Sequence, residues 1–315
     1  MNPHNESNDM NDGDSSPDIP ISAADALIAS TAEPAPDGLV ERVAATAATA
    51  RPSGRVVVLG TGAAEPIDAF CATALELRSL LHELDDAEWH ATTETPYGSV
   101  RDLVAHLAGS EDYCTRALSR VPAADPVADF DHPACSREVA ASLAALTNDE
   151  LAEAWFALST TFAEACRNDP DTELVSLHQL PVSIGGALVL RTFELWAHTE
   201  DICVAIGRPL PRLDGPRLAC MASRLVGAIG SLVRLPDTPD MAGRVVLLGP
   251  GGGVAEFGAP TTTGDAPGTR IVVDIVDYCR VASRRLRADD LACTVTGDDR
   301  LLAPFLAATA MFAKD

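Results

Sequence analysis

One segment decides how the first half of this chain folds: Arg191-Thr192-Phe193-Glu194-Leu195-Trp196-Ala197-His198-Thr199-Glu200-Asp201. As a helix, it places four polar side chains on one stripe, because steps of three and four residues return to the same face. Those side chains are Arg191, Glu194, His198 and Asp201. The residues between them are mostly apolar, and a helix that is apolar on most of its girth is buried. A buried glutamate and a buried histidine need strong partners, and one divalent metal ion satisfies both.

A third metal ligand is expected from another helix, because two side chains do not hold a metal ion well. His106 follows Ser99 and Asp102, whose spacing is that of a capping box, so His106 is predicted to lie on a helix that begins there. We predict a site formed by His106, Glu194 and His198 between two helices, with one open position for water or substrate. Each residue also has an ordinary interpretation: a lone helical histidine is commonly a satisfied core residue, and a Glu/His pair four apart is commonly a solvated hydrogen bond.

The ligand set predicts the kind of metal centre. Two histidines and one glutamate with an open position are typical of catalytic zinc, although ligand type alone also allows Ni²⁺, Fe²⁺ or Mn²⁺. An open zinc position binds a low-molecular-weight thiol as thiolate, which is a nucleophile at neutral pH. Around the ligands, Asp201 is expected to orient His198, and Arg191 is expected to pair with a carboxylate. Three other histidines fall in predicted loops, where surface positions are expected. They are His90, His132 and His178.

Composition sets the class of protein. The 315 residues suffice for two domains, and 46 acidic against 23 basic residues give a formal net charge of −23, which disfavours binding to nucleic acid or to an anionic membrane. The sequence contains neither a basic and apolar leader nor an apolar run of about 18 residues, so we expect no signal peptide and no membrane span. The eight cysteines form no C-x-x-C pair, which favours reduced thiols in a cytoplasmic protein.

Three regions follow from the patterning. Residues 1–64 are predicted to be a disordered acidic tail with a short amphipathic helix at 38–51. A nucleotide loop at 55–62 is disfavoured, because Glu65 stands where the third glycine of G-x-G-x-x-G would fall. Residues 65–210 show four main helices joined by loops, which is the pattern of a helix bundle.

Two helix ends are predicted in this region. Asn148 is an N-cap candidate for a helix at 148–167, and Gly207 is the expected C-cap of the helix that carries Glu194 and His198.

The region 211–315 is predicted to be a small α+β domain. Strands are expected at 244–248, 254–257, 270–275 and 292–296, and helices at 217–233, 277–287 and 299–312. The glycine-rich stretch 249–253 lacks the lysine and the helix that a phosphate loop needs, so a hairpin turn is predicted there. The fold class is therefore mainly α with an α+β C-terminal domain.

A family resemblance rests on motifs in both regions. The motifs are Val100-Arg-Asp-Leu-Val-Ala-His106-Leu-Ala, Arg191-x-x-Glu194-x-x-x-His198-x-x-Asp201 with Gly207-x-Pro209, Asp277-Tyr-Cys-Arg280-Val-Ala-Ser-Arg284-Arg285, and Gly297-Asp298-Asp299-Arg300-Leu301. In their order and spacing, the chain resembles the mycothiol-dependent maleylpyruvate isomerases. The resemblance covers about 65–315, and it implies a DinB-like metal-binding four-helix bundle followed by a sterol-carrier-like domain.

The resemblance also implies a reaction. The thiol would be mycothiol, which adds to a conjugated cis double bond, allows rotation and is eliminated to give the trans product. A dicarboxylate substrate such as maleylpyruvate needs cations, and Arg280, Arg284 or Arg285 could supply one. An S-transferase acting on other electrophiles is a related possibility.

A second hypothesis belongs to another class: a regulatory or binding protein that retains the metal-binding bundle. The acidic tail favours it, since an isomerase does not need such a tail, and residues 1–51 would contact a protein partner. The segment Pro36-x-Gly38-Leu-Val-x-Arg42-Val, followed by Arg51-Pro52, resembles the region after the zinc finger of some actinobacterial anti-sigma factors, although the His/Cys ligands of such a finger are absent.

Overall fold

The computed structural model describes residues 62–118, 132–168, 174–177, 180–232, 242–257 and 268–310. All of them belong to one compact unit, Val58–Asp315. The predicted acidic tail, the helix at 38–51, most of the glycine motif at 55–62 and His178 lie outside the described residues. Among the helices that the structure describes, none is both long and apolar enough to cross a membrane.

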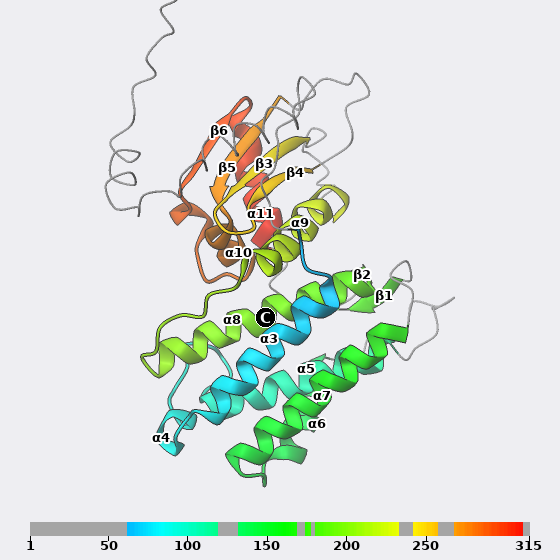
Figure 1. Ribbon diagram of the computed structural model, residues 1–315, viewed down its shortest axis with the longest axis vertical. Helices are drawn as coiled ribbons and strands as arrows, with labels where there is room; N and C mark the ends of the chain where they lie inside the picture. The colour runs from blue at the N-terminus through cyan, green and yellow to red at the C-terminus, as the bar shows by residue number, and fades with distance from the viewer. Residues whose placement is uncertain are drawn as a thin grey trace, which may run out of the picture. The chain divides into compact units, whose positions relative to one another are not determined.

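The first part of the described chain is a helical body, as predicted. It contains α3 (Pro66–His82), α4 (Asp86–Trp89), α5 (Val100–Leu118), α6 (His132–Leu143), α7 (Asn148–Asn168) and α8 (Ile184–Ala205), with a hairpin of β1 (Leu174–Leu177) and β2 (Leu180–Ser183) before α8. The long helices lie alongside one another: α3 packs on α7 and α8, and α5 packs on α6 and α7 (Figure 1). The fully buried side chains between them include Leu77, Leu103, Leu107, Trp155 and Leu195.

Local signals fix most of the helix ends. Before α5, Asp102 accepts hydrogen bonds from the backbone and hydroxyl of Ser99, as the capping box predicts. After α8, Gly207 has a φ of 68°, and the amide of Arg208 reaches back to the carbonyl of Cys203, which is the expected glycine stop.

One predicted cap was misplaced. Asn148 was expected to be the N-cap of the following helix, but Thr147 takes this role. The backbone and hydroxyl of Thr147 bond the carboxylate of Glu150, and the amide of Glu150 bonds the hydroxyl in return. Thr147 and Glu150 form a capping box, which is a stronger cap than the asparagine alone. The side-chain amide of Asn148 instead accepts from Arg101 and donates to Asp86.

The last part of the described chain is α+β, which confirms the predicted fold class. Helix α9 (Gly215–Leu232) precedes β3 (Gly243–Leu248), β4 (Gly253–Phe257), β5 (Arg270–Asp274), α10 (Ile275–Ala282), η1 (Ala288–Asp290), β6 (Cys293–Thr296), η2 (Asp299–Leu301) and α11 (Leu302–Ala310). The four strands form one sheet in the order β4-β3-β5-β6, in which only β3 and β5 run parallel (Figure 1). The glycine-rich stretch joins β3 to β4 as the predicted hairpin.

The helix predicted over 277–287 is shorter than expected. It begins earlier, where the side chain of Asp274 caps the amides of Val276 and Asp277, and it ends at Ala282. Two residues later Arg284 has a φ of 56°, in the left-handed region that ends a helix. This turn redirects the three arginines of the predicted motif, because only Arg280 remains on the helix.

Two apolar cores meet along α8. One core lies within the helical body and includes Leu188 and Leu195. The other contains α9, the sheet and α11, and it also takes Val189, Phe193 and Trp196 from α8. Helix α8 is therefore buried on most of its girth, as its composition predicts. The predicted domain boundary at 210/211 stays a prediction, since the two cores lie in one compact unit.

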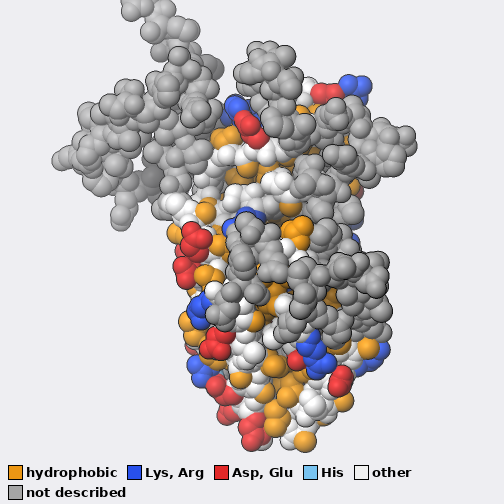
Figure 2. Space-filling model, turned by 90° about the vertical axis from the view of Figure 1, so that its right-hand side faces the viewer, with side chains coloured by type: hydrophobic (Ala, Val, Ile, Leu, Met, Phe, Trp, Pro, Cys, Tyr) orange, Lys and Arg blue, Asp and Glu red, His pale blue; other side chains and the backbone are white. Residues whose placement is uncertain are grey.

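Charged side chains are spread over the surface. Figure 2 shows acidic and arginine side chains interspersed with apolar ones on one face of the described residues, above all over the helical body. Several form ion pairs that link helices far apart in sequence, such as Arg78 with Glu153 at 2.8 Å. Exposed pairs of this kind contribute little stability, so packing of the two cores holds the described fold together.

Candidate metal centre

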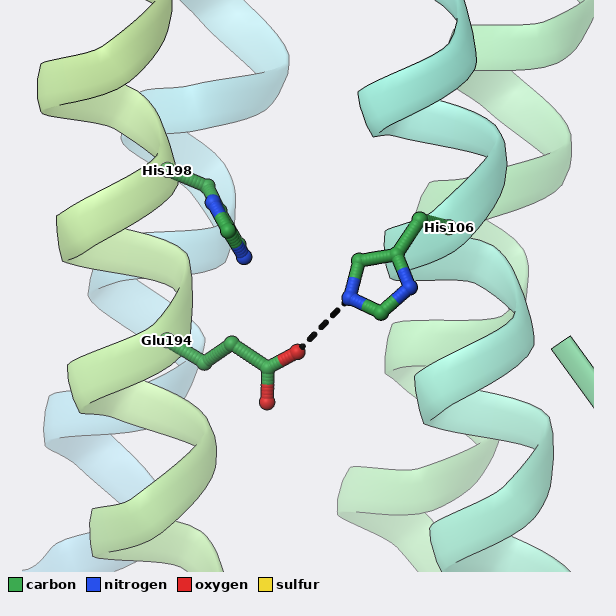
Figure 3. Close-up of side chains that lie close together, drawn as sticks. All are labelled: His106, Glu194 and His198. Atoms are coloured by element: carbon green, nitrogen blue, oxygen red, sulfur yellow. Dashed lines mark ion pairs between the residues drawn. The ribbon is translucent and has the colours of Figure 1, made fainter. Parts of the chain in front are cut away.

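Three side chains from two helices converge in the helical body. His106 comes from α5, and Glu194 and His198 come from successive turns of α8 (Figure 3). One ligand atom of each lies within 4.8 Å of the others. The two histidines are 6% and 1% exposed, while the Glu194 side chain keeps 24% of its surface accessible. The three residues predicted from the sequence are thus brought together in space.

The contact between His106 and Glu194 suits a metal ion better than a hydrogen bond. The Nε2 atom of His106 lies 3.3 Å from Oε1 of Glu194, yet it is a buried polar atom without a hydrogen-bond partner among the described residues. An imidazole nitrogen and a carboxylate oxygen that face each other in this way are both electron-pair donors, and a cation between them satisfies both. The chemistry of the donor set therefore fits a divalent ion.

His198, the second histidine, is held by a carboxylate on the side of its ring that faces away from the cluster. Nδ1 of His198 lies 2.9 Å from Oδ2 of Asp201, three residues on, and the far ring nitrogen points toward Glu194 and His106 (Figure 3). Arg285, from the turn after α10, donates to both oxygens of Asp201, at 2.7 and 2.5 Å. Burial opposes ionisation of Asp201, but the contacts with His198 and Arg285 keep the pKa of this carboxyl below its ordinary value. Asp201 thus makes the predicted contact with His198, and its role in orienting a metal ligand stays a prediction.

Arg191 bridges two carboxylates. Its Nη1 donates to Oε2 of Glu194, and its Nε and Nη2 donate to Glu111 at 3.2 and 3.1 Å. Burial alone would raise the pKa of Glu194, but Arg191 and the two histidines hold it well below its ordinary value. Burial raises the pKa of the Glu111 carboxyl, and the Arg191 guanidinium opposes that rise. The predicted pairing of Arg191 with a carboxylate is present, and Glu111 is a partner that the sequence did not reveal.

A cavity of about 970 Å³ opens beside His106. Its wall is formed mainly by α5, α6 and α7, and it combines apolar side chains with arginine, histidine and tyrosine side chains. The polar and aromatic part of the lining consists of Tyr97, Arg101, Asp102, His106, His132, Ser136, Arg137 and Arg284. Tyr97 stacks on His106 with ring centroids 3.7 Å apart, so it covers the ligand on one side. The volume is within the range of ordinary small-molecule sites.

The three arginines of the C-terminal motif have different positions. Arg284 lines the cavity, with its Nε bonded to the carbonyl of Ala310 at 3.2 Å. Arg280 instead donates to Oε1 of Glu200 at 2.9 Å, and Arg285 is engaged with Asp201. The structure therefore brings Arg284 to the cavity, whereas Arg280 and Arg285 bind carboxylates of α8.

His132 was expected on the surface in a loop, and this expectation was wrong. It is the first residue of α6 and lines the cavity. Its Nε2 lies 3.2 Å from the hydroxyl of Ser110, which donates in turn to Oε1 of Glu194 at 3.3 Å. The sequence held no signal for this, since the chain before His132 contains no regular pattern. His90, by contrast, is exposed as predicted.

Comparison with known proteins finds a match to one family model. Residues 70–203 match the family model described as the mycothiol maleylpyruvate isomerase N-terminal domain. No curated protein matches. Two solved structures of mycothiol-dependent maleylpyruvate isomerase, one of them a mutant, are each 17% identical to this chain, with TM-scores of 0.46 and 0.45. Each comparison covers 73% of this chain and 92% of the solved one.

The matched residues and the candidate centre coincide. The match begins within α3 and ends within α8, so it contains His106, Glu194, His198 and the buried carboxylates and arginine around them. The C-terminal α+β part lies beyond it. Residues 70–203 of this chain are therefore similar to the mycothiol maleylpyruvate isomerase N-terminal domain family.

Proposed function

We propose that this chain is a metal-dependent enzyme that uses a low-molecular-weight thiol to isomerise or conjugate small electrophilic substrates. The observation that carries the proposal is the convergence of His106, Glu194 and His198, of which His106 also lines a cavity, within the part of the chain that matches the family model. The family description supports mycothiol as the thiol and maleylpyruvate as the type of substrate. The ligand set supports Zn²⁺ as the ion.

The three ligands would hold the ion through two imidazole nitrogens and one carboxylate oxygen. A bound divalent ion supplies Lewis acidity, which lowers the pKa of a thiol and favours its thiolate. The chain's own groups prepare the site: Asp201 fixes the ring of His198, and Arg191 fixes one oxygen of Glu194. Tyr97 covers one face of His106 and excludes water from it.

Substrate binding is assigned to the cavity. A thiol that adds reversibly to a conjugated double bond converts it to a single bond that rotates, and the chain must then hold the substrate's carboxylates while the bond turns. Arg284 is the proposed cation for this task, because it lines the cavity and comes from outside the helical body. Arg280 is assigned a different role, since its guanidinium is bound to Glu200. Its contact holds α10 against α8.

Metal analysis and a thiol-dependence assay test the proposal. Purified full-length protein is expected to contain about one divalent ion per chain. Cis-to-trans isomerisation and thiol conjugation are then measured with mycothiol, with another thiol and with none, before and after removal of the metal. Turnover should require both the metal and a thiol. Full activity without any thiol would refute the proposal and leave metal-assisted hydrolysis as the better explanation.

A further inference from the structure

A carboxylate outside the ligand set is buried behind Arg191. Glu111 lies on α5, one turn and a half beyond His106, and its exposed fraction is 0%. Its two oxygens accept from Nε and Nη2 of Arg191 at 3.2 and 3.1 Å, and the hydroxyl of Ser159 lies 3.4 Å from Oε1. A charged group with no access to water is costly unless an opposite charge and hydrogen bonds compensate it, and Arg191 and Ser159 supply these to Glu111. Nothing in the proposed reaction uses Glu111 directly.

The geometry of Arg191 joins Glu111 to the metal centre. One edge of the guanidinium binds Glu111, and the remaining nitrogen, Nη1, donates to Oε2 of Glu194. The other oxygen of Glu194, Oε1, lies 3.3 Å from Nε2 of His106 and accepts from Ser110. Arg191 therefore determines which oxygen of the ligand is turned toward the two histidines. The orientation of Arg191 is in turn fixed by Glu111.

Charge balance gives Glu111 a second effect. Arg191 is 3% exposed, so its charge must be neutralised by protein groups. With Glu111 present, the arginine shares its charge between two carboxylates. Without it, the whole attraction of a buried guanidinium would fall on Glu194 and would compete with a cation for that carboxylate. Mutation of groups that hold a metal ligand in this way commonly lowers metal affinity about tenfold to a hundredfold.

We propose that Glu111 is a positioning residue for the metal centre: through Arg191 it keeps Oε1 of Glu194 turned toward His106 and His198 and available to a cation. The inference rests on the proposed metal-binding function. It assigns to the fully buried Glu–Arg pair the task of setting metal affinity, beyond any contribution of that pair to stability.

The test measures metal affinity in full-length protein, by competition of Zn²⁺ with a chelator, and records the absorption spectrum of the Co²⁺ form. Glu111→Gln keeps the size of the side chain and removes its charge, and it is expected to weaken Zn²⁺ binding about tenfold or more and to alter the Co²⁺ spectrum. Glu111→Asp keeps the charge but withdraws it from Arg191, so an intermediate affinity is expected. If Glu111→Gln does not fold, Glu111→Asp carries the test, and wild-type affinity in it overturns the proposal.

The matched control is Glu76→Gln. Glu76 binds Arg217, another buried arginine that is shared between two carboxylates, and Arg217 does not contact the three ligands. Glu76→Gln is expected to leave Zn²⁺ affinity unchanged while lowering the melting temperature of the metal-free protein. Wild-type affinity in Glu111→Gln, or an equal loss in Glu76→Gln, would overturn the role of Glu111 and leave the proposed function intact. A wild-type protein that binds no metal would overturn both.

Discussion

His198 has a different task for each side of its ring. Its Nδ1 side is bound to Asp201, and its far nitrogen points toward Glu194 and His106. Replacement by alanine is expected to abolish metal binding and to leave helix content unchanged, since Leu195 and the apolar neighbours of α8 still pack. His106→Ala should behave in the same way. Metal content after gel filtration, with circular dichroism on the same samples, measures both effects.

The exposed His90 provides the control for these variants. His90→Ala removes an imidazole outside the cluster, so it should keep the full metal content. Unchanged metal in both His106→Ala and His198→Ala would contradict the assigned ligand set.

Arg285 acts on the same histidine through Asp201, and its Nη2 also lies 3.4 Å from Nδ1 of His198. Both oxygens of Asp201 accept from it, so Arg285→Gln should let the carboxylate turn and loosen His198. Metal affinity is expected to fall about tenfold, which is the usual loss when a residue that supports a metal ligand is mutated. Arg287→Gln is the matched control, because the Arg287 side chain is 75% exposed and, within the described part of the chain, forms ion pairs with its neighbours Asp289 and Asp290 alone. Equal affinities in the two variants would show that Arg285 has no part in orienting the ligand.

Single residues also show how far sequence reasoning reaches. The stripe of Arg191, Glu194 and His198 is a local property of one helix, so spacing alone reveals it. His106 was assigned by its chemistry and its helix, together with a family resemblance. Glu111 and His132 could not be found in this way, because their roles depend on which faces of α5, α6 and α8 meet in space.

At the scale of the element, the turn after α10 is the most informative. Arg284 has a φ of 56°, which costs a non-glycine residue about 1–2 kcal/mol, and it lines the cavity. Arg284→Gly should therefore keep or raise the melting temperature and should raise KM for a dicarboxylate substrate several-fold. Arg284→Ala separates the effects, because it removes the cation and keeps the strained φ. A KM unchanged in both variants would remove Arg284 from the substrate site.

The ends of elements were predictable where the signal is local. Ser99 with Asp102 and the glycine at 207 mark α5 and α8 correctly. The end of α10 was not predictable, because an arginine in a left-handed conformation carries no sequence mark. Asn148 misled for another reason: Thr147 with Glu150 is the stronger cap.

At the scale of the whole described unit, α8 belongs to two cores. It supplies Leu195 to the core of the helical body, and Phe193 and Trp196 to the core that holds the sheet. If one core unfolds, the side chains of α8 that pack in it lose their contacts, and the other core, which α8 also completes, is destabilised. We therefore expect a single cooperative unfolding transition, with equal calorimetric and van't Hoff enthalpies. Two separate transitions would contradict this expectation and would favour independent domains divided near 210/211.

The contact of Arg285 with Asp201 has a thermodynamic consequence. It joins a turn of the C-terminal α+β part to the residue that orients His198, so the packing of that part and the binding of an ion at His198 are linked equilibria. Linkage is reciprocal: whatever free energy the packed turn adds to ion binding, the bound ion returns to the packing of the turn. Chelation should accordingly increase amide hydrogen exchange first around 283–287, at a distance along the chain from every proposed ligand.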